Sequence, residues 1–307
     1  METINDENTV LHEETAVMLG DFDGLHTAHT ELICRGIEYA HKNGLKSGIL
    51  LFDVNTKSVT ANRNAQLITP YKEKLRLLDG MGIDFAYTVS FNESFMTKTP
   101  EEFVLLLKDK LNCKAVFAGY DYRFGYKAEG DAKLLAGLGE KYGFKAVILP
   151  EFKLNGITVS STYIRNCIKD GNIEEANKLL GRCFCVCGDV EHGLQNGRKL
   201  GFPTANVGVG GNMLIPGSGV YAGFTYVNGE KYGSVINVGK NPTFDAEKTT
   251  VESHIIGFSD DIYEKYVRVE FVKRIRGDIK FENIGKLAEQ IKKDTATAEK
   301  ILNGEEL

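Results

Sequence analysis

Short apolar runs alternate with longer amphipathic stretches through residues 1–181. The apolar runs have the length and composition of buried strands, at 16–20, 47–52, 85–91, 114–119 and 145–150. The amphipathic stretches have helical spacing, at 28–43, 70–81, 100–111, 131–142, 161–170 and 173–180. Strands separated by helices of this length indicate βαβ units around a parallel sheet, with right-handed crossovers.

The pattern changes near Gly181, where glycine becomes frequent and apolar positions alternate with polar ones. This alternation occupies the runs 220–227, 231–238, 250–258 and 266–275. A period of two with glycine-rich turns predicts an antiparallel sheet or a small barrel. Helical spacing returns from 282 to 302. We therefore expect two domains, an α/β domain over 1–181 and a β-barrel domain with a terminal helix over 182–307.

Composition and charge exclude several classes of protein. The chain has 307 residues, which suits two domains, and a net charge of −5 that argues against coating a nucleic acid. No apolar run approaches the ~18 residues that a membrane span needs. The polar, acidic N-terminus lacks the features of a secretion signal. We therefore expect a cytoplasmic protein with small-molecule partners and no nucleic-acid or membrane partner. The sequence does not indicate whether the protein is a monomer or an oligomer.

Six cysteines are too few, for a chain of this length, to form a disulfide framework, and none form a CxxC pair. We expect reduced thiols. Cys183, Cys185 and Cys187 alternate along one predicted strand, so they share a face. Zinc ligands are usually paired at turn spacings, so we expect these three to be small buried residues that line the barrel.

A strand-to-helix turn carries the first candidate chemistry. Residues 20–29, GDFDGLHTAH, follow the first predicted strand and open the first predicted helix. Gly20 and Gly24 allow close backbone approach, and a helix N-terminus suits phosphate. His26 and His29 are three residues apart, so both can face one site and neutralise charge during transfer. Two histidines alone would fit a capped helix start, but this setting favours a phosphate site.

The same residues resemble the adenylyltransferase signature GxFDGxHxGH of bacterial bifunctional riboflavin kinase/FMN adenylyltransferases, the FAD synthetase family. Residues 160–165, SSTYIR, match the family's second signature SSTxxR, and residues 119–125 resemble its GxDFRFG loop. The resemblance implies a Rossmann-like nucleotidyltransferase domain. It also implies catalytic roles for His26, His29 and Arg165. Binding of ATP and FMN is implied for Gly20, Asp23, Gly24, Asp121, Arg123, Ser161 and Thr162.

The segment SSTYIR also has a plain physical reading. Ser161 or Thr162 suits the cap of a helix over 162–170. Arg165, which follows in the same helix, suits a bidentate contact with phosphate. A helix cap followed by a solvated arginine is the alternative reading of this segment.

Residues 197–206, GRKLGFPTAN, hold the second candidate site. Thr204 and Asn206 share a face of an extended strand, and Mg²⁺ prefers oxygen ligands such as theirs. No Walker loop occurs in the chain. A Pro-Thr-Ala-Asn turn is ordinary by itself, but all ten residues match the family's riboflavin kinase signature GRxLGFPTAN. The resemblance implies that Thr204 ligates Mg²⁺ and that Asn206 helps to hold it, with ATP as co-substrate.

The resemblance implies further nucleotide- or flavin-binding residues in this domain. Residues 188–193 are similar to the family's glycine-containing flap over the nucleotide. The implied binding residues are Gly188, Gly193, Arg198, Gly201, Pro203, Thr204, Asn206 and Arg276. For Arg276, a solvated position at a strand end is an equal alternative.

Residues 249–255, TTVESHI, match the family's TVExHI strand. Val251 and Ser253 lie on one face of such a strand, and Glu252 and His254 lie on the other. A carboxylate beside a nucleotide suits a general base that takes the proton of an attacking hydroxyl. The resemblance places the catalytic base at Glu252. We expect His254 to make a local hydrogen bond.

The resemblance implies two reactions. The barrel domain phosphorylates riboflavin with ATP to FMN, and the α/β domain adenylylates FMN with ATP to FAD and pyrophosphate. Two departures concern the α/β domain: Ala28 replaces a glycine, and residues 52–56 lack both prolines of the family's FxPxP segment. A riboflavin kinase with a degenerate first domain is therefore the alternative function. A flavin- or nucleotide-sensing regulator is a third alternative, which the intact residues Thr204, Asn206 and Glu252 disfavour.

Overall fold

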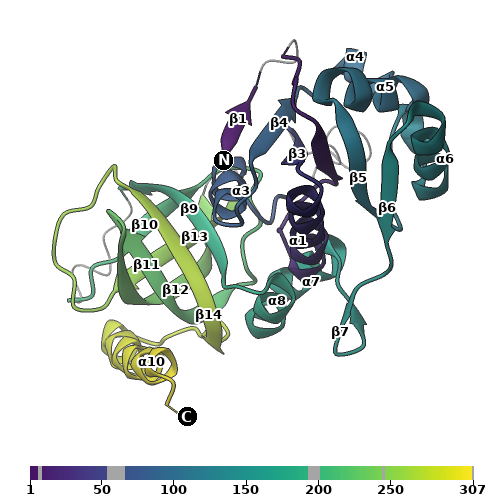
Figure 1. The fold of residues 1–307 in the computed structure, drawn as a ribbon. Helices are drawn as coiled ribbons and strands as arrows, with labels where there is room; N and C mark the ends of the chain where they lie inside the picture. The colour runs from purple at the N-terminus through teal and green to yellow at the C-terminus, as the bar shows by residue number, and fades with distance from the viewer. Residues whose placement is uncertain (6–8, 54–65, 193–200, 244–245, 306–307) are drawn as a thin grey trace. The chain divides into compact units, whose positions relative to one another are not determined.

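The computed structural model describes residues 1–5, 9–53, 66–192, 201–243 and 246–305 (Figure 1). The chain packs into two compact units. The first comprises Met1–Ala65 and Tyr71–Ser160, and the second comprises Gln66–Pro70 and Ser161–Leu307. Two helices that precede the change of pattern near Gly181 therefore pack with the second unit.

A six-stranded parallel sheet forms the centre of the first unit (Figure 1). In spatial order its strands are β1 (Glu2–Ile4), β4 (Phe85–Val89), β3 (Lys46–Phe52), β2 (Thr15–Leu19), β5 (Cys113–Gly119) and β6 (Lys145–Leu149). The five predicted strands are confirmed. β1 has no counterpart among the predicted elements, because three residues are too short to show a periodicity.

Helices cover both faces of this sheet, as the alternating pattern predicts. They are α1 (Thr27–Lys42), α3 (Tyr71–Asp79), α4 (Glu93–Met96), α5 (Pro100–Leu111) and α6 (Ala132–Tyr142), with a 3₁₀ turn at Tyr126–Ala128. Residues of α1 and α3 share one core cluster, and residues of α5 and α6 share another. Alternate residues of β2 enter the two clusters, Met18 the first and Val17 the second. The unit is therefore a doubly wound α/β layer.

The strand order reverses at β2. From β2 the chain moves outward through β3 and β4, and it then returns to β5 on the other side. Ligands of open α/β sheets bind at such a switch point, beyond the carboxyl ends of the strands. The turn that follows β2 and the loop that follows β5 meet at this position. The hairpin of β7 (Lys153–Leu154) and β8 (Ile157–Thr158) completes the unit.

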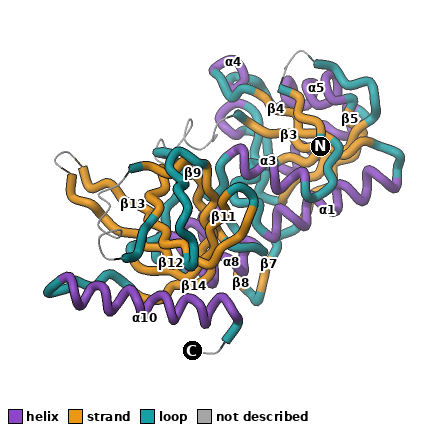
Figure 2. The backbone as a smooth tube through the Cα atoms, turned by 90° about the vertical axis from the view of Figure 1, so that its left-hand side faces the viewer, coloured by secondary structure: helices purple, strands orange, loops and turns teal. Residues whose placement is uncertain are grey.

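The second unit is a closed antiparallel barrel (Figure 1). Its strands are β9 (Phe184–Glu191), β10 (Ala205–Val209), β11 (Gly219–Val227), β12 (Glu230–Thr243), β13 (Ala246–Ile255) and β14 (Tyr266–Arg276). Three helices belong to it, α7 (Ser161–Lys169), α8 (Ile173–Leu180) and α10 (Ile284–Asn303). Figure 2 shows α10 lying along the barrel, where Ala298 packs against Val220 and Val235. The predicted barrel and terminal helix are confirmed.

The cysteines of β9 do not line the barrel interior. Val186 faces the interior and is fully buried opposite Val269. Cys185 and Cys187 lie on the other face, opposite Glu270 and Arg268 of β14. Cys185 and Cys187 are buried, as predicted, and Cys183 is half-buried. The prediction of a lining role is wrong, because residues 184–188 are buried on both faces of the strand and the period of two does not mark which face is the interior. Within the described ranges, no three side chains of metal-ligating type gather into a metal site.

Among the helices of the described residues, none combines the length and the apolar character that a membrane span requires.

Candidate active sites

The turn between β2 and α1 has an unusual backbone. Phe22 and Leu25 have φ values of 50° and 40°, and Gly24 has a φ of 87°. Only glycine adopts this region without strain, and strained residues of other types are concentrated at functional sites. The side chains of Phe22 and Leu25 are buried. Their burial stabilises the turn in this conformation. The backbone of the turn is therefore held at the carboxyl end of β2.

His26 and His29 lie together at the start of α1, as their spacing predicts. His26 is the N-cap, and its Nδ1 accepts a hydrogen bond from the His29 backbone N–H at 3.3 Å. The two rings stack with their centroids 3.6 Å apart and an interplanar angle of 11°. Because Nδ1 is an acceptor, the neutral His26 imidazole carries its proton on Nε2. Nε2 is therefore the ring nitrogen that donates a hydrogen bond.

The loop after β5 lies beside this turn. The Tyr122 backbone N–H bonds to the Gly119 carbonyl at 3.1 Å, and Phe124 and Gly130 exchange backbone hydrogen bonds. Burial raises the pKa of Tyr122, and the charge of Asp21 raises it further. The loop therefore faces the first turn, as neighbouring carboxyl ends of a parallel sheet should. Asp121 and Arg123 of the same loop are exposed.

A buried cation joins the first site from α3, and the sequence patterns did not point to it. The Lys74 Nζ donates to the Asp21 carbonyl oxygen at 3.0 Å, and the residue is 7% exposed. Burial lowers the pKa of Lys74, while Asp23 and Asp21 act in the opposite direction. The available signal was its place four residues before the buried Leu78, which puts Lys74 on the core face of an amphipathic helix.

Helix α7 carries the second adenylyltransferase signature. It begins at Ser161. Ser161 and Thr162 are thus its first residues, and the prediction that one of them caps the helix from outside is wrong. The Arg165 Nε donates to the Gln66 carbonyl oxygen at 3.0 Å, within the second unit. The binding roles of these three side chains remain predictions.

The barrel brings two of the predicted kinase residues, Asn206 and Glu252, onto one face. Asn206 of β10 lies opposite Glu252 of β13 on one side and Glu191 of β9 on the other. Directly opposed residues of antiparallel strands share a face. Val251 and Ser253 are buried on the interior face, so the predicted division of this strand is confirmed. Burial raises the pKa of Glu252.

His254 makes the local hydrogen bond that the sequence predicts. Its Nδ1 lies 2.9 Å from the Pro203 carbonyl oxygen. The Phe202 ring packs edge-on against the imidazole, with the centroids 5.5 Å apart. This contact ties β13 to the segment that enters β10, directly before Thr204.

Gly188 does not lie in a flap. It is a buried residue inside β9, paired with both neighbouring strands. A Cβ at this position would lie 2.2 Å from the Gly208 carbonyl oxygen, so close strand packing requires a glycine. Gly188 therefore has a structural role in the barrel, and its contact with the nucleotide stays a prediction. Gly201, with a φ of 83°, occupies the turn before β10, whereas Gly193 and Arg198 lie outside the described residues.

Arg276 is not a solvated arginine at a strand end, because it is paired with a carboxylate. Its guanidinium donates to the Asp294 carboxylate of α10, at 3.1 Å from Nε and 2.8 Å from Nη2. The Asp294 side chain is only 4% exposed. This bidentate pair holds α10 against the barrel. The pairing gives Arg276 a structural role, and its contact with flavin or phosphate stays a prediction.

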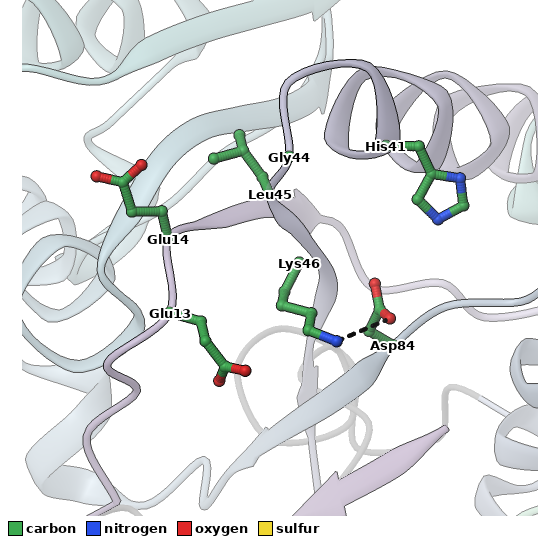
Figure 3. Close-up of a pocket in the computed structure, with 7 residues that line it drawn as sticks. All are labelled: Glu13, Glu14, His41, Gly44, Leu45, Lys46 and Asp84. Carbon is green, nitrogen blue, oxygen red and sulfur yellow. Dashed lines mark ion pairs between the residues drawn. The ribbon is translucent and has the colours of Figure 1, made fainter.

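A separate hollow of about 580 Å³ lies in the first unit (Figure 3). Its lining residues are Glu13, Glu14, His41, Gly44, Leu45, Lys46 and Asp84. Lys46 and Asp84 form an ion pair there at 3.7 Å. Glu14, Lys46 and Asp84 stand where β2, β3 and β4 begin. The hollow is therefore at the end of the sheet opposite to the histidine turn.

The comparisons with known proteins assign to this two-unit fold the class of transferases of phosphorus-containing groups. A family model described as riboflavin kinase matches residues 180–302, and one described as FAD synthetase matches residues 8–163. The Bacillus subtilis bifunctional riboflavin kinase/FMN adenylyltransferase is 34% identical over 93% of this chain and 92% of its own length. The Escherichia coli K12 relative of the same description is 35% identical over the same shares. The chain belongs to the bifunctional riboflavin kinase/FMN adenylyltransferase family.

A solved structure from Streptococcus pneumoniae, described as a macrolide-efflux protein, has the same fold. It is 31% identical, covers 97% of this chain and 99% of its own, and has a TM-score of 0.88. The efflux described for that protein differs from the function that both family models and the curated relatives carry.

Proposed function

We propose that this chain converts riboflavin to FAD in two steps. The barrel unit transfers the γ-phosphoryl group of ATP to riboflavin, which yields FMN and ADP. The α/β unit transfers AMP from a second ATP to FMN, which yields FAD and pyrophosphate. The observation that carries this proposal is the presence of both family models on one chain, each over its own cluster of site residues.

For the kinase step, Glu252 is the general base. Burial raises its pKa, which brings it closer to the pH at which the enzyme works. Its carboxylate takes the proton of the riboflavin 5′-hydroxyl as that oxygen attacks the γ-phosphorus of ATP. Asn206, opposite Glu252, and Thr204, at the entrance to β10, position the phosphates on the same face. Positioning and charge neutralisation supply most of the rate of such transfers.

ATP-using kinases and adenylyltransferases generally need a divalent metal, and we propose Mg²⁺ here. The donor set fits a hard cation, because Thr204 offers a hydroxyl and Asn206 an amide oxygen. When bound, Mg²⁺ neutralises charge on the phosphate oxygens. His254 fixes the Pro203 carbonyl beside Thr204 and so orients the hydroxyl-bearing residue.

For the adenylyl step, the turn after β2 receives the phosphates of ATP. The N-terminus of α1 presents backbone N–H groups and a positive dipole end. The His26 Nε2–H donates to a phosphate oxygen, and the stacked His29 adds a second imidazole at the same place. An FMN phosphate oxygen then attacks the α-phosphorus in line with the leaving pyrophosphate. Asp23, Asp121 and Arg123 of the first unit are proposed to contact ATP and FMN. For Ser161, Thr162 and Arg165 of the second signature we likewise propose a role in binding phosphate.

The deciding experiment follows both products over time. Purified protein is incubated with riboflavin, excess ATP and Mg²⁺, and the flavins are separated by chromatography. We expect FMN first and FAD second. Glu252→Gln should form FMN from riboflavin about 10²–10⁴-fold more slowly but should still form FAD from supplied FMN at the rate of the parent.

A second function, riboflavin kinase alone, is favoured by Ala28, which lies in the first turn of α1 beside the two histidines. In that case FMN accumulates without FAD. The variant Ala28→Gly then decides whether the methyl group is the cause, because restored FAD formation would assign the defect to this position. No FMN from the parent protein, with Glu252 intact, would contradict the kinase assignment itself.

A further inference from the structure

We propose that Lys74 is a positioning residue of the adenylyltransferase site, which holds the Asp21–Asp23 turn in the conformation that receives ATP. The proposal rests on the function proposed above and assigns this role to a helix that carries neither family signature. Lys74 acts through the backbone of the turn and does not itself need to touch the substrate.

The contact lies at the point where the turn begins. Asp21 directly follows Gly20 at the end of β2, and its carbonyl oxygen accepts the Lys74 Nζ hydrogen bond at 3.0 Å. The orientation of this peptide group sets the φ angle of Phe22, the first of the three residues with positive φ. An ammonium group that holds this carbonyl therefore favours the strained conformation over relaxed ones.

The burial of Lys74 supports a role beyond packing. The residue is 7% exposed, and burial opposes its charged form. An apolar residue at this helical position would fill the space without that desolvation cost. The charged side chain instead faces Asp21 and Asp23 of the turn. At this position the lysine supplies a charge and a hydrogen bond that a methionine of similar volume would not supply.

The charged groups around Lys74 give the direction of its pH dependence. Asp21 and Asp23 face it from the turn, Tyr122 faces Asp21 from the loop after β5, and Glu73 on its own helix is paired with Arg76. Lys74 is protonated below its lowered pKa and loses its charge as the pH rises through it. FAD formation should therefore decline on the alkaline side.

The test compares three full-length variants. Lys74→Met removes the charge at similar volume, Lys74→Arg keeps it, and Lys72→Met alters an exposed lysine of the same helix. Hydrogen exchange of the peptide that covers residues 20–26 reports the turn directly. Steady-state kinetics of FAD formation from FMN report the reaction. Riboflavin phosphorylation in the same samples shows that the barrel unit is folded.

We expect Lys74→Met to exchange faster in the 20–26 peptide and to lose about 100-fold in kcat/KM for ATP, as displaced binding groups do. Lys74→Arg should show the hydrogen exchange of the parent in the 20–26 peptide. The alkaline limb of its FAD formation should move to higher pH, because arginine keeps its charge to higher pH than lysine. Lys72→Met should match the parent. If Lys74→Met matches the parent in both exchange and kinetics, the proposal is overturned.

Two further outcomes separate this proposal from the proposed function. A parent that forms no FAD, with faster turn exchange in Lys74→Met, refutes the adenylyltransferase assignment and supports the positioning role. If Lys74→Met exchanges faster throughout the first unit, Lys74→Arg decides. In Lys74→Arg, a native exchange pattern together with an alkaline limb of FAD formation at higher pH than in the parent supports the proposal. An alkaline limb at the same pH as in the parent overturns it.

Discussion

His254 and Pro203 are joined by a hydrogen bond of 2.9 Å between the imidazole Nδ1 and the carbonyl oxygen. A carbonyl only accepts, so Nδ1 is the donor and the neutral ring has its lone pair on Nε2. His254 stands two residues after Glu252, and Pro203 stands one residue before Thr204. The bond therefore ties the strand of the proposed base to the strand of the proposed metal ligand.

Loss of this bond should slow the kinase step. We expect His254→Phe to keep the edge contact with Phe202 and to lower the kcat of FMN formation about tenfold, because the entrance to β10 is no longer held. FAD formation from supplied FMN should not change. Chromatographic assays of both steps measure this. An unchanged kcat would show that the barrel holds Thr204 without the imidazole.

Glu252 should act as the base of the kinase step. Glu252→Gln should lower the kcat of FMN formation by about 10²–10⁴-fold, with a small effect on the KM for ATP. Because burial raises the pKa of Glu252, the acid form persists to higher pH than for a solvated glutamate. Activity should therefore fall as the pH falls through that raised pKa. A pH–rate profile whose acidic limb survives in Glu252→Gln would assign the limb to another group.

Gly188 should be needed for the closure of the barrel. In Gly188→Ala the new Cβ would meet the Gly208 carbonyl oxygen at 2.2 Å, and backbone cannot move aside easily. We expect a loss of about 1–3 kcal/mol in the free energy of unfolding, measured by denaturant titration. Gly210→Ala is the matched control, because nothing lies within 4 Å of a Cβ there. Equal stability of the two variants would contradict this packing account.

The Arg276–Asp294 pair should matter for stability and not for substrate binding. Removal of one partner from a buried pair costs about 3–5 kcal/mol, because the other charge remains buried. Arg276→Met should therefore destabilise the barrel unit, while the KM for riboflavin should remain near that of the parent. Thermal unfolding and flavin kinetics measure the two effects. A raised KM with unchanged stability would support the ligand-binding role.

Local patterns predicted much of this protein. The alternation of apolar runs and helical stretches predicted the parallel sheet, and the period of two predicted the barrel. His26 and His29 could be placed together from their spacing alone, because residues three apart share one helical turn. The separation of Glu252 from Ser253 likewise follows from the alternation along a single strand.

Contacts between distant segments could not be predicted in this way. The bond from Lys74 to Asp21 spans 53 positions, and the salt bridge from Arg276 to Asp294 depends on where α10 packs. The face of β9 that holds the cysteines was also undetermined, because residues 184–188 are buried on both faces and periodicity does not distinguish the two.

The amino-acid sequence by itself determined the type of each main element, the two signatures and the residues able to carry out the chemistry, because these depend on short-range spacing. The tertiary structure alone decided which of those residues meet. Strand register placed Asn206 opposite Glu252. Close packing explained Gly188, and a neighbouring helix supplied Lys74. These outcomes depend on the packing of segments far apart in the chain, which local periodicity does not encode.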